Sequence, residues 1–205
     1  MRNKGLFVLF VIGSFLLFNT IVSAAPIFFN DRASFNVAAG GGLSFESFEN
    51  DFAVAETIVF NGFTVSETSG INALGQLRDF PGLVNAITDG TGGLGYDDND
   101  DSIGSFFAFT NAISAFGLDI ATNPGSTITI GGSVNYVLPL GNNTPSFWGV
   151  IDTAGITSIT FDASGGPNVG FDAVSFGQVV PIPAAVWLFG SGLVGLAGLR
   201  RKFQK

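Results

Sequence analysis

Residues 58–65 read Ile58-Val59-Phe60-Asn61-Gly62-Phe63-Thr64-Val65, two runs of β-branched and aromatic residues on either side of an Asn-Gly pair. Asn and Gly both accept the positive φ angles of a type I′ turn, so this stretch predicts a β-hairpin. A second hairpin is predicted where Gly131-Gly132 separates residues 127–130 from residues 133–137. The centre of the chain is therefore expected to consist of strands and tight turns.

Similar short segments extend outward from these hairpins, separated by Gly, Asn, Asp and Pro. Nine or ten strands at nearly even spacing predict an all-β fold, an antiparallel β-sandwich. In residues 43–49, near-alternation places Leu43 and Phe45 inward, and an irregularity before Phe48 places that residue inward as well. A single short helix is predicted over residues 31–38, with Asn30 or Asp31 as its N-cap. The remaining predicted strands cover residues 84–88, 102–109, 113–120, 146–151, 156–162 and 169–176.

The N-terminus has the three parts of a secretory signal peptide. Arg2 and Lys4 form a basic start, residues 6–18 are an apolar run, and Val22-Ser23-Ala24 is a small-residue cleavage site. The apolar run is too short to indicate a membrane span. Residues 1–24 are therefore predicted to be removed during export.

The C-terminus contains a second hydrophobic segment. Val180-Pro181-Ile182-Pro183-Ala184 leads into the uncharged residues 184–199, and Arg200-Arg201-Lys202 follows. Sixteen helical residues reach about 24 Å, close enough to a hydrocarbon core of about 30 Å for a transmembrane helix whose basic end snorkels. The basic cluster is expected to remain cytoplasmic, acting as a stop-transfer signal and leaving the preceding residues across the membrane.

This tail resembles the PEP-CTERM sorting signal in its Val-Pro-Leu-Pro-Ala variant, with Ile182 in place of leucine. The run Pro183-Ala184-Ala185-Val186-Trp187-Leu188-Phe189-Gly190-Ser191-Gly192-Leu193 continues the family pattern. The resemblance implies an exosortase as processing partner, cleavage near the proline motif, and transient membrane anchoring before delivery to the cell surface or the medium. It also favours a jelly-roll ectodomain. The implied organisation is a signal peptide at 1–24, an ectodomain at 25–178 and a sorting segment at 179–205.

The predicted ectodomain is strongly acidic. All sixteen carboxylates of the chain lie in it with only two basic residues, Arg32 and Arg78, so its formal net charge is −14. Nucleic acids and anionic membrane surfaces require a basic footprint, which this domain lacks. The chain has no cysteine and so no disulfide, although an exported protein could form one.

Most catalytic arrangements are excluded by composition. Without histidine or cysteine, neither a Ser-His-Asp nor a Cys-His constellation can be built, and histidine-ligated metal sites are excluded as well. A carboxylate pair acting as in a glycosidase is the remaining enzymatic option, with Glu46 and Glu49 as first candidates. The alternative is that both are solvated or metal-bound carboxylates at a strand edge.

An acidic run supplies the first candidate metal site. Asp97, Asp98, Asn99, Asp100 and Asp101 place four carboxylates and an amide in five residues, and calcium prefers such oxygen ligands. An EF-hand is excluded, because the required glycine and glutamate positions carry Ser102 and Ala108. The alternative is an exposed acidic turn that keeps the domain soluble.

A second candidate calcium site joins the two ends of the domain. Jelly-roll carbohydrate-binding modules often hold calcium between a glutamate near the first strand and an aspartate in the last. Glu46, Glu49 and Asp172 occupy similar positions here. Asp172 is equally consistent with the polar face of an alternating strand.

Glycan binding would require exposed aromatic side chains. Tyr96, Tyr136 and Trp148 are candidates for stacking on sugar rings, since all three lie near predicted turns or strand ends. Aromatic residues of a β-sandwich are more often core residues, and Trp148 beside Phe147 fits that alternative.

Together these features predict an exported, non-enzymatic surface or extracellular-matrix protein. It is expected to associate with exopolysaccharide or biofilm and to bind glycan. The alternative is a secreted glycoside hydrolase-like enzyme that uses a carboxylate pair.

Overall fold

The structure of the chain is a computed structural model that describes its β-rich centre. Both terminal segments lie outside the described residues. These are the predicted signal peptide and, at the other end, the predicted sorting motif, the predicted transmembrane helix at 184–199 and the basic cluster at 200–202. No helix within the described residues is long and apolar enough to cross a membrane. The described residues are 25–68, 74–76, 87–97, 104–121, 127–132, 134–137, 144–162 and 168–179.

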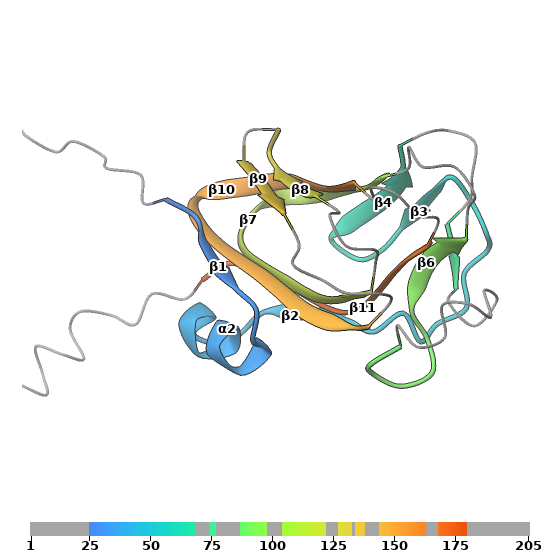
Figure 1. Cartoon of the computed structure of the whole chain (residues 1–205), viewed down its shortest axis with the longest axis horizontal. Helices are drawn as coiled ribbons and strands as arrows, with labels where there is room; N and C mark the ends of the chain where they lie inside the picture. Colours follow the sequence, from blue (N-terminus) through green and yellow to red (C-terminus); the bar gives the residue numbers. More distant parts are fainter. Residues whose placement is uncertain are drawn as a thin grey trace, which may run out of the picture.

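The described strands form one antiparallel sheet, which confirms the all-β prediction (Figure 1). Its main path runs in the order β5-β6-β11-β7-β10-β8-β9, while β1 adds to β10, β2 to β11, and the β3–β4 hairpin to β7. The strands are β1 (Ile27–Phe29), β2 (Ser44–Glu46), β3 (Thr57–Val59), β4 (Phe63–Glu67), β5 (Gly75–Gln76), β6 (Leu94–Asp97), β7 (Gly104–Ala121), β8 (Thr127–Ile130), β9 (Val134–Val137), β10 (Ser146–Asp162) and β11 (Asn168–Gly177).

Two long strands bend and carry the sheet from one layer to the other. Residues 146–151 of β10 pair with 115–120 of β7, and 158–162 pair with 104–108, with register shifts between the two blocks. Gly155, with a φ of 100°, lies in the shifted segment of β10. One layer contains β3, β4, β8 and β9, and the facing layer contains β1, β2, β6 and β11 (Figure 1). Two strands each were predicted over the ranges of β7 and β10, which is wrong because each strand continues through an exposed bend, residues 110–112 of β7 and 153–155 of β10, where the two strands do not pair.

The core lies between these layers and is rich in phenylalanine. Phe107, on the first half of β7, is fully buried. Its ring centroid lies 5.3 Å from that of Phe171 on β11 and 5.5 Å from that of Phe161 on β10, so one side chain contacts both layers. Phe63 and Phe116 complete its aromatic surroundings. Most phenylalanines of the described residues are thus core residues, as the sequence indicated.

Both predicted hairpins are present, but the first turn differs from the prediction. Gly62 has a φ of 97°, whereas Asn61 is not among the described non-glycine residues with positive φ. A positive φ at the second turn residue alone is typical of a type II turn, so the type I′ prediction is wrong. The ring of Phe176 lies 2.9 Å from where a Gly62 Cβ would be, which leaves no room for a side chain. In the second hairpin Gly131 and Gly132 both have positive φ.

The single described helix, α2 (Arg32–Ala39), lies on the outside of the sheet (Figure 1). Asp31 is its N-cap, and its Oδ2 accepts a hydrogen bond of 2.7 Å from the Ser34 amide. The buried ring of Phe35 packs on a flat site made by Gly117 and Gly149, which face each other on β7 and β10. A Cβ on either glycine would lie 2.9–3.0 Å from that ring. Glycine at both positions therefore allows the helix to dock.

The segment around β2 departs from simple alternation. Phe48 is buried and has a φ of 55°, and its amide donates to Glu46 Oε1 at 2.9 Å. This kink ends β2 after three residues. Phe45 was predicted to point inward, which is wrong, because 55% of its surface is exposed. The described part of the predicted strand 84–88, residues 87 and 88, is not in a strand.

Candidate functional site

Arg32 is the only basic side chain among the described residues, and it joins α2 to the sheet. Its Nη2 lies 2.8 Å from Asp119 Oδ1 and donates to the Ala173 carbonyl at 2.9 Å. Its Nη1 donates to Ser175 Oγ at 3.3 Å, and the guanidinium carbon lies 4.6 Å from the centre of the Phe147 ring. The charge of Arg32 is therefore neutralised by an ion pair and oriented by three further contacts.

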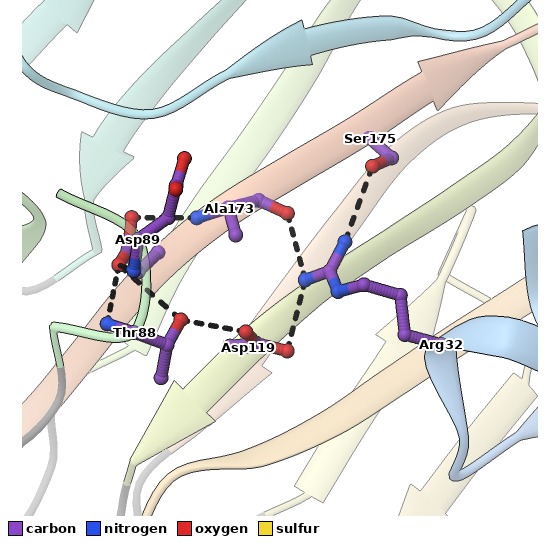
Figure 2. Close-up of polar contacts among 7 residues, drawn as sticks. Arg32, Thr88, Asp89, Asp119, Ala173 and Ser175 are labelled. Atoms are coloured by element: carbon purple, nitrogen blue, oxygen red, sulfur yellow. Dashed lines mark hydrogen bonds and ion pairs between the residues drawn. The ribbon is translucent and has the colours of Figure 1, made fainter.

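Thr88 extends this network to a second carboxylate (Figure 2). Its Oγ1 donates to Asp119 Oδ2 at 2.6 Å. The amides of Thr88 and Asp89 donate to Asp172 Oδ2 at 2.6 and 2.7 Å. Asp119 and Asp172 are directly opposite on β7 and β11, a position where two like charges repel. Arg32 and the two amides compensate for that repulsion.

Asp172 is fully buried, and its surroundings alter its ionisation. Removal from water raises the pKa of the carboxyl above its ordinary value, while hydrogen bonds from the amides of Asp89, Thr88 and Ala173 oppose the rise. The backbone is also unusual here, because Ala173 has a φ of 51° at the register shift between β11 and β7. The bulge directs the Ala173 carbonyl to Arg32.

The raised pKa of Asp172 leads to a pH-dependent stability. A carboxyl whose folded pKa exceeds its unfolded value of about 3.9 stabilises the fold most below that value, and the contribution is lost as the pH rises through the folded pKa. We expect the unfolding free energy of the wild type, minus that of Asp172→Asn, to fall as the pH increases from about 3.9. Denaturant unfolding across this range would measure it, and a difference that grows with pH would contradict the prediction.

The loop that precedes β6, which contains Thr88 and Asp89, is also held at its other end by Glu49. Glu49 Oε1 accepts hydrogen bonds from the amides of Thr91 and Gly92, both at 2.8 Å, and Oε2 accepts from Thr91 Oγ1 at 2.9 Å. Together with Asp172, it fixes the loop before β6 at two points. The loop is thereby held against β2 and β11, which hydrogen-bond to each other.

These contacts surround a pocket of about 290 Å³. That volume is near the lower end of the range for small-molecule sites. Phe45 supplies an exposed aromatic ring, Asp89 is exposed, and the guanidinium–carboxylate pair supplies the polar part. Its lining residues are Arg32, Phe45, Thr88, Asp89, Asp119 and Ala173.

The structure brings the segments that carry the predicted carboxylates Glu46, Glu49 and Asp172 together. These segments are neighbours because β2 pairs with β11, as expected for the first and last core strands. Each carboxylate accepts hydrogen bonds from backbone amides. Within the described ranges, no three acidic side chains gather as a metal-ligand group. Calcium binding by these three carboxylates stays a prediction.

Of the acidic run at residues 97–101, the structure describes only the first residue. Asp97 ends β6 and pairs with Asn168 of β11. Asp98, Asn99, Asp100 and Asp101 lie outside the described residues. Calcium binding by this run stays a prediction.

The aromatic candidates have different environments. Trp148 is 2% exposed and packs against Phe116 and Phe161, so its prediction as a stacking residue is wrong and the core alternative holds. Tyr136 is half-buried, with its ring 4.8 Å from that of Phe28. Tyr96 lies in β6, and its stacking role stays a prediction.

Sequence reasoning missed the residues that line the pocket. Arg32 was a detectable signal, as one of two basic residues in a strongly acidic segment. Phe45 was missed because near-alternation from Leu43 onward placed its side chain inward, whereas 55% of its surface is exposed. Thr88 and Asp119 had no local signal, since they meet only through the sheet topology.

Comparison with known proteins gives limited information. No protein-family model matches the chain, and no curated protein matches it. Among solved structures, TmCBM61 in complex with β-1,4-galactotriose is similar with a TM-score of 0.32 and 11% identity over 57% of this chain and 88% of that one. The enzymatically active domain of tailspike protein 4 from bacteriophage CBA120 has a TM-score of 0.33 and 16% identity over 64% of this chain and 20% of that one. Both similarities are too low to define a shared fold or activity.

Proposed function

We propose that this chain is an exported, non-enzymatic surface or matrix protein that binds glycan through the pocket beside Phe45. The observation that carries the proposal is an exposed aromatic ring next to fixed polar groups in one small pocket. A sugar presents an apolar C–H face and a rim of hydroxyl groups. The ring of Phe45 matches the face, and Asp89 with the Thr88 hydroxyl matches the rim.

The rigidity of the pocket supports a binding role. The lining residues come from α2, β2, β7, β11 and the loop before β6, and they are linked by an ion pair and short hydrogen bonds. A preformed site loses little conformational entropy on binding. We further propose that the two layers around the bend form a β-sandwich of jelly-roll type.

Replacing Phe45 by alanine is expected to weaken binding to the producer's exopolysaccharide by about 5- to 30-fold. This corresponds to about 1–2 kcal/mol for one half-exposed aromatic side chain that becomes covered. Co-sedimentation of the full chain in detergent with the polysaccharide would measure it. Phe45→Trp should retain affinity, and equal affinity of the alanine variant would place the glycan elsewhere.

A glycoside hydrolase is the second candidate. Asp119 and Asp172 are adjacent carboxylates in unlike environments, one paired with Arg32 and the other buried with a raised pKa, and such a division is typical of acid–base pairs. Against this role, Asp172 is fully buried and both of its oxygens accept hydrogen bonds. Release of new reducing ends that disappears in Asp119→Asn would favour the hydrolase.

Export and sorting complete the proposal. We propose cleavage of the signal peptide after Ala24, transient anchoring by residues 184–199, and processing by an exosortase near Pro181-Ile182-Pro183. The Val179 amide donates to Ser114 Oγ at 2.7 Å and Gln178 Nε2 donates to the Ala112 carbonyl at 2.6 Å, so contacts with β7 reach the residue that precedes Val180. The domain's contacts thus extend one residue past the predicted boundary at 178.

Calcium is expected to stabilise the protein through the acidic run at 97–101. A ligand that binds only the folded state at a hundredfold excess over its Kd contributes about 2.7 kcal/mol, or about 5–10 °C in Tm at this size. Thermal unfolding in millimolar calcium, compared with matched ionic strength, would measure the shift. The shift should vanish when Asp97, Asp98, Asp100 and Asp101 are all changed to asparagine. No calcium-specific shift in the wild type would leave the run as a solubilising turn.

A further inference from the structure

The charge of the pocket indicates which glycans it selects, an inference that rests on the proposed glycan-binding function. Three ionisable side chains line the pocket, Arg32, Asp89 and Asp119, and the buried Asp172 adjoins it through Thr88. Arg32 and Asp119 neutralise each other at 2.8 Å. The charges that remain in and beside the pocket are negative.

The charge of Arg32 is already paired with a carboxylate of the protein. Its guanidinium is already bound by Asp119, by the Ala173 carbonyl and by Ser175 Oγ, and it lies over the Phe147 ring. A uronate or sulfate group would have to share the guanidinium with Asp119 and would add a third negative charge to the carboxylates of Asp89 and Asp119 that line the pocket. Acidic sugars are therefore disfavoured.

A cationic group has a partner already in place. The side chain of Asp89 is exposed on the pocket lining, while its amide is fixed by Asp172 at 2.7 Å, so the carboxylate is presented from an anchored backbone. Phe45, on β2, contributes its exposed ring to the same pocket. The predicted ectodomain's net charge of −14 also raises the local concentration of cationic ligands.

We infer that the pocket selects a glycan carrying a free amine, a de-N-acetylated amino sugar, with its ammonium group paired to Asp89 and its ring face on Phe45. One pair of this kind at a partly exposed site changes affinity by about fivefold. Repetition of the amine along a polymer multiplies the effect through avidity.

Oligosaccharides of glucosamine, N-acetylglucosamine and galacturonate, equal in length, test this inference. Binding to the full chain in detergent would be measured by calorimetry at about pH 6, where the amine is protonated. The glucosamine oligomer should bind about fivefold more tightly than its N-acetylated counterpart, and added salt should remove most of that preference. Asp89→Asn should abolish the preference, so that the glucosamine and N-acetylglucosamine oligomers bind this variant with equal affinity.

The control is Glu56→Gln, which removes an exposed carboxylate next to β3 in the other layer and should leave the preference intact. Phe45→Ala should weaken binding to both hexosamine oligomers. Equal affinity for the two hexosamines, tighter binding of the galacturonate oligomer, or a preference that survives Asp89→Asn would overturn the inference. If none of the oligomers binds but the producer's exopolysaccharide does, the amino-sugar inference fails and glycan binding stands. If the exopolysaccharide also fails to bind, the proposed function itself fails.

Discussion

Phe107→Ala is expected to lower the unfolding free energy by about 3–5 kcal/mol. The side chain is fully buried and its ring contacts Phe63, Phe116, Phe161 and Phe171, so no single neighbour can fill the space it leaves. A loss of this size is a large fraction of the about 5–15 kcal/mol that stabilises an ordinary domain. Denaturant unfolding followed by circular dichroism would measure it.

Phe45→Ala is the matched control, since it makes the same chemical change at a ring that is 55% exposed. Its cost should stay below about 1 kcal/mol. Similar losses for the two variants would mean that Phe107 is not at the centre of a core between two layers.

The double change Pro181→Ala and Pro183→Ala is expected to block maturation and leave an unprocessed, membrane-retained chain. Proline fixes φ and cannot continue a helix, so the pair is expected to keep the motif outside the helix predicted at 184–199. Alanine favours helix formation and would allow the helix to extend through the motif. Immunoblots of membrane, surface and medium fractions from the producing cells would detect the retained form.

Pro145→Ala, in the described domain, is the control for this experiment and should mature normally. Maturation of the double variant at the wild-type rate would contradict the sorting proposal. The size of the exported chain distinguishes blocked processing from misfolding. A chain whose processing is blocked keeps its C-terminal segment, whereas a misfolded chain that is still processed loses it.

Local sequence signals predicted those elements whose structure depends on neighbouring residues. The two hairpins follow from Asn61-Gly62 and Gly131-Gly132, whose glycines permit the positive φ of a tight turn, and the helix follows from its N-cap Asp31. The continuity of β7 and β10 was not predictable in this way. The exposed residues at their bends resemble turns and do not pair between the two strands, and each strand is continued by the pairing on either side of its bend.

The candidate site was less accessible to sequence reasoning because it is assembled across the sheet. Arg32 contacts Asp119 and Ala173, residues far away in the chain, and Thr88 reaches Asp119 from a loop. A carboxylate such as Asp172 is seen in the sequence as a candidate ligand, whereas in the fold its oxygens are occupied by backbone amides. Burial and hydrogen bonding, rather than residue type, decide its role.

The most direct measurement of the central claim is sedimentation of the producer's exopolysaccharide in the presence of the full chain in detergent, with the polysaccharide's length determined before and after. A non-enzymatic binding protein should be carried into the pellet, lose that association in Phe45→Ala, and leave the length of the polysaccharide unchanged. A chain that stays in the supernatant would contradict glycan binding. A polysaccharide that becomes shorter would contradict the absence of enzymatic activity.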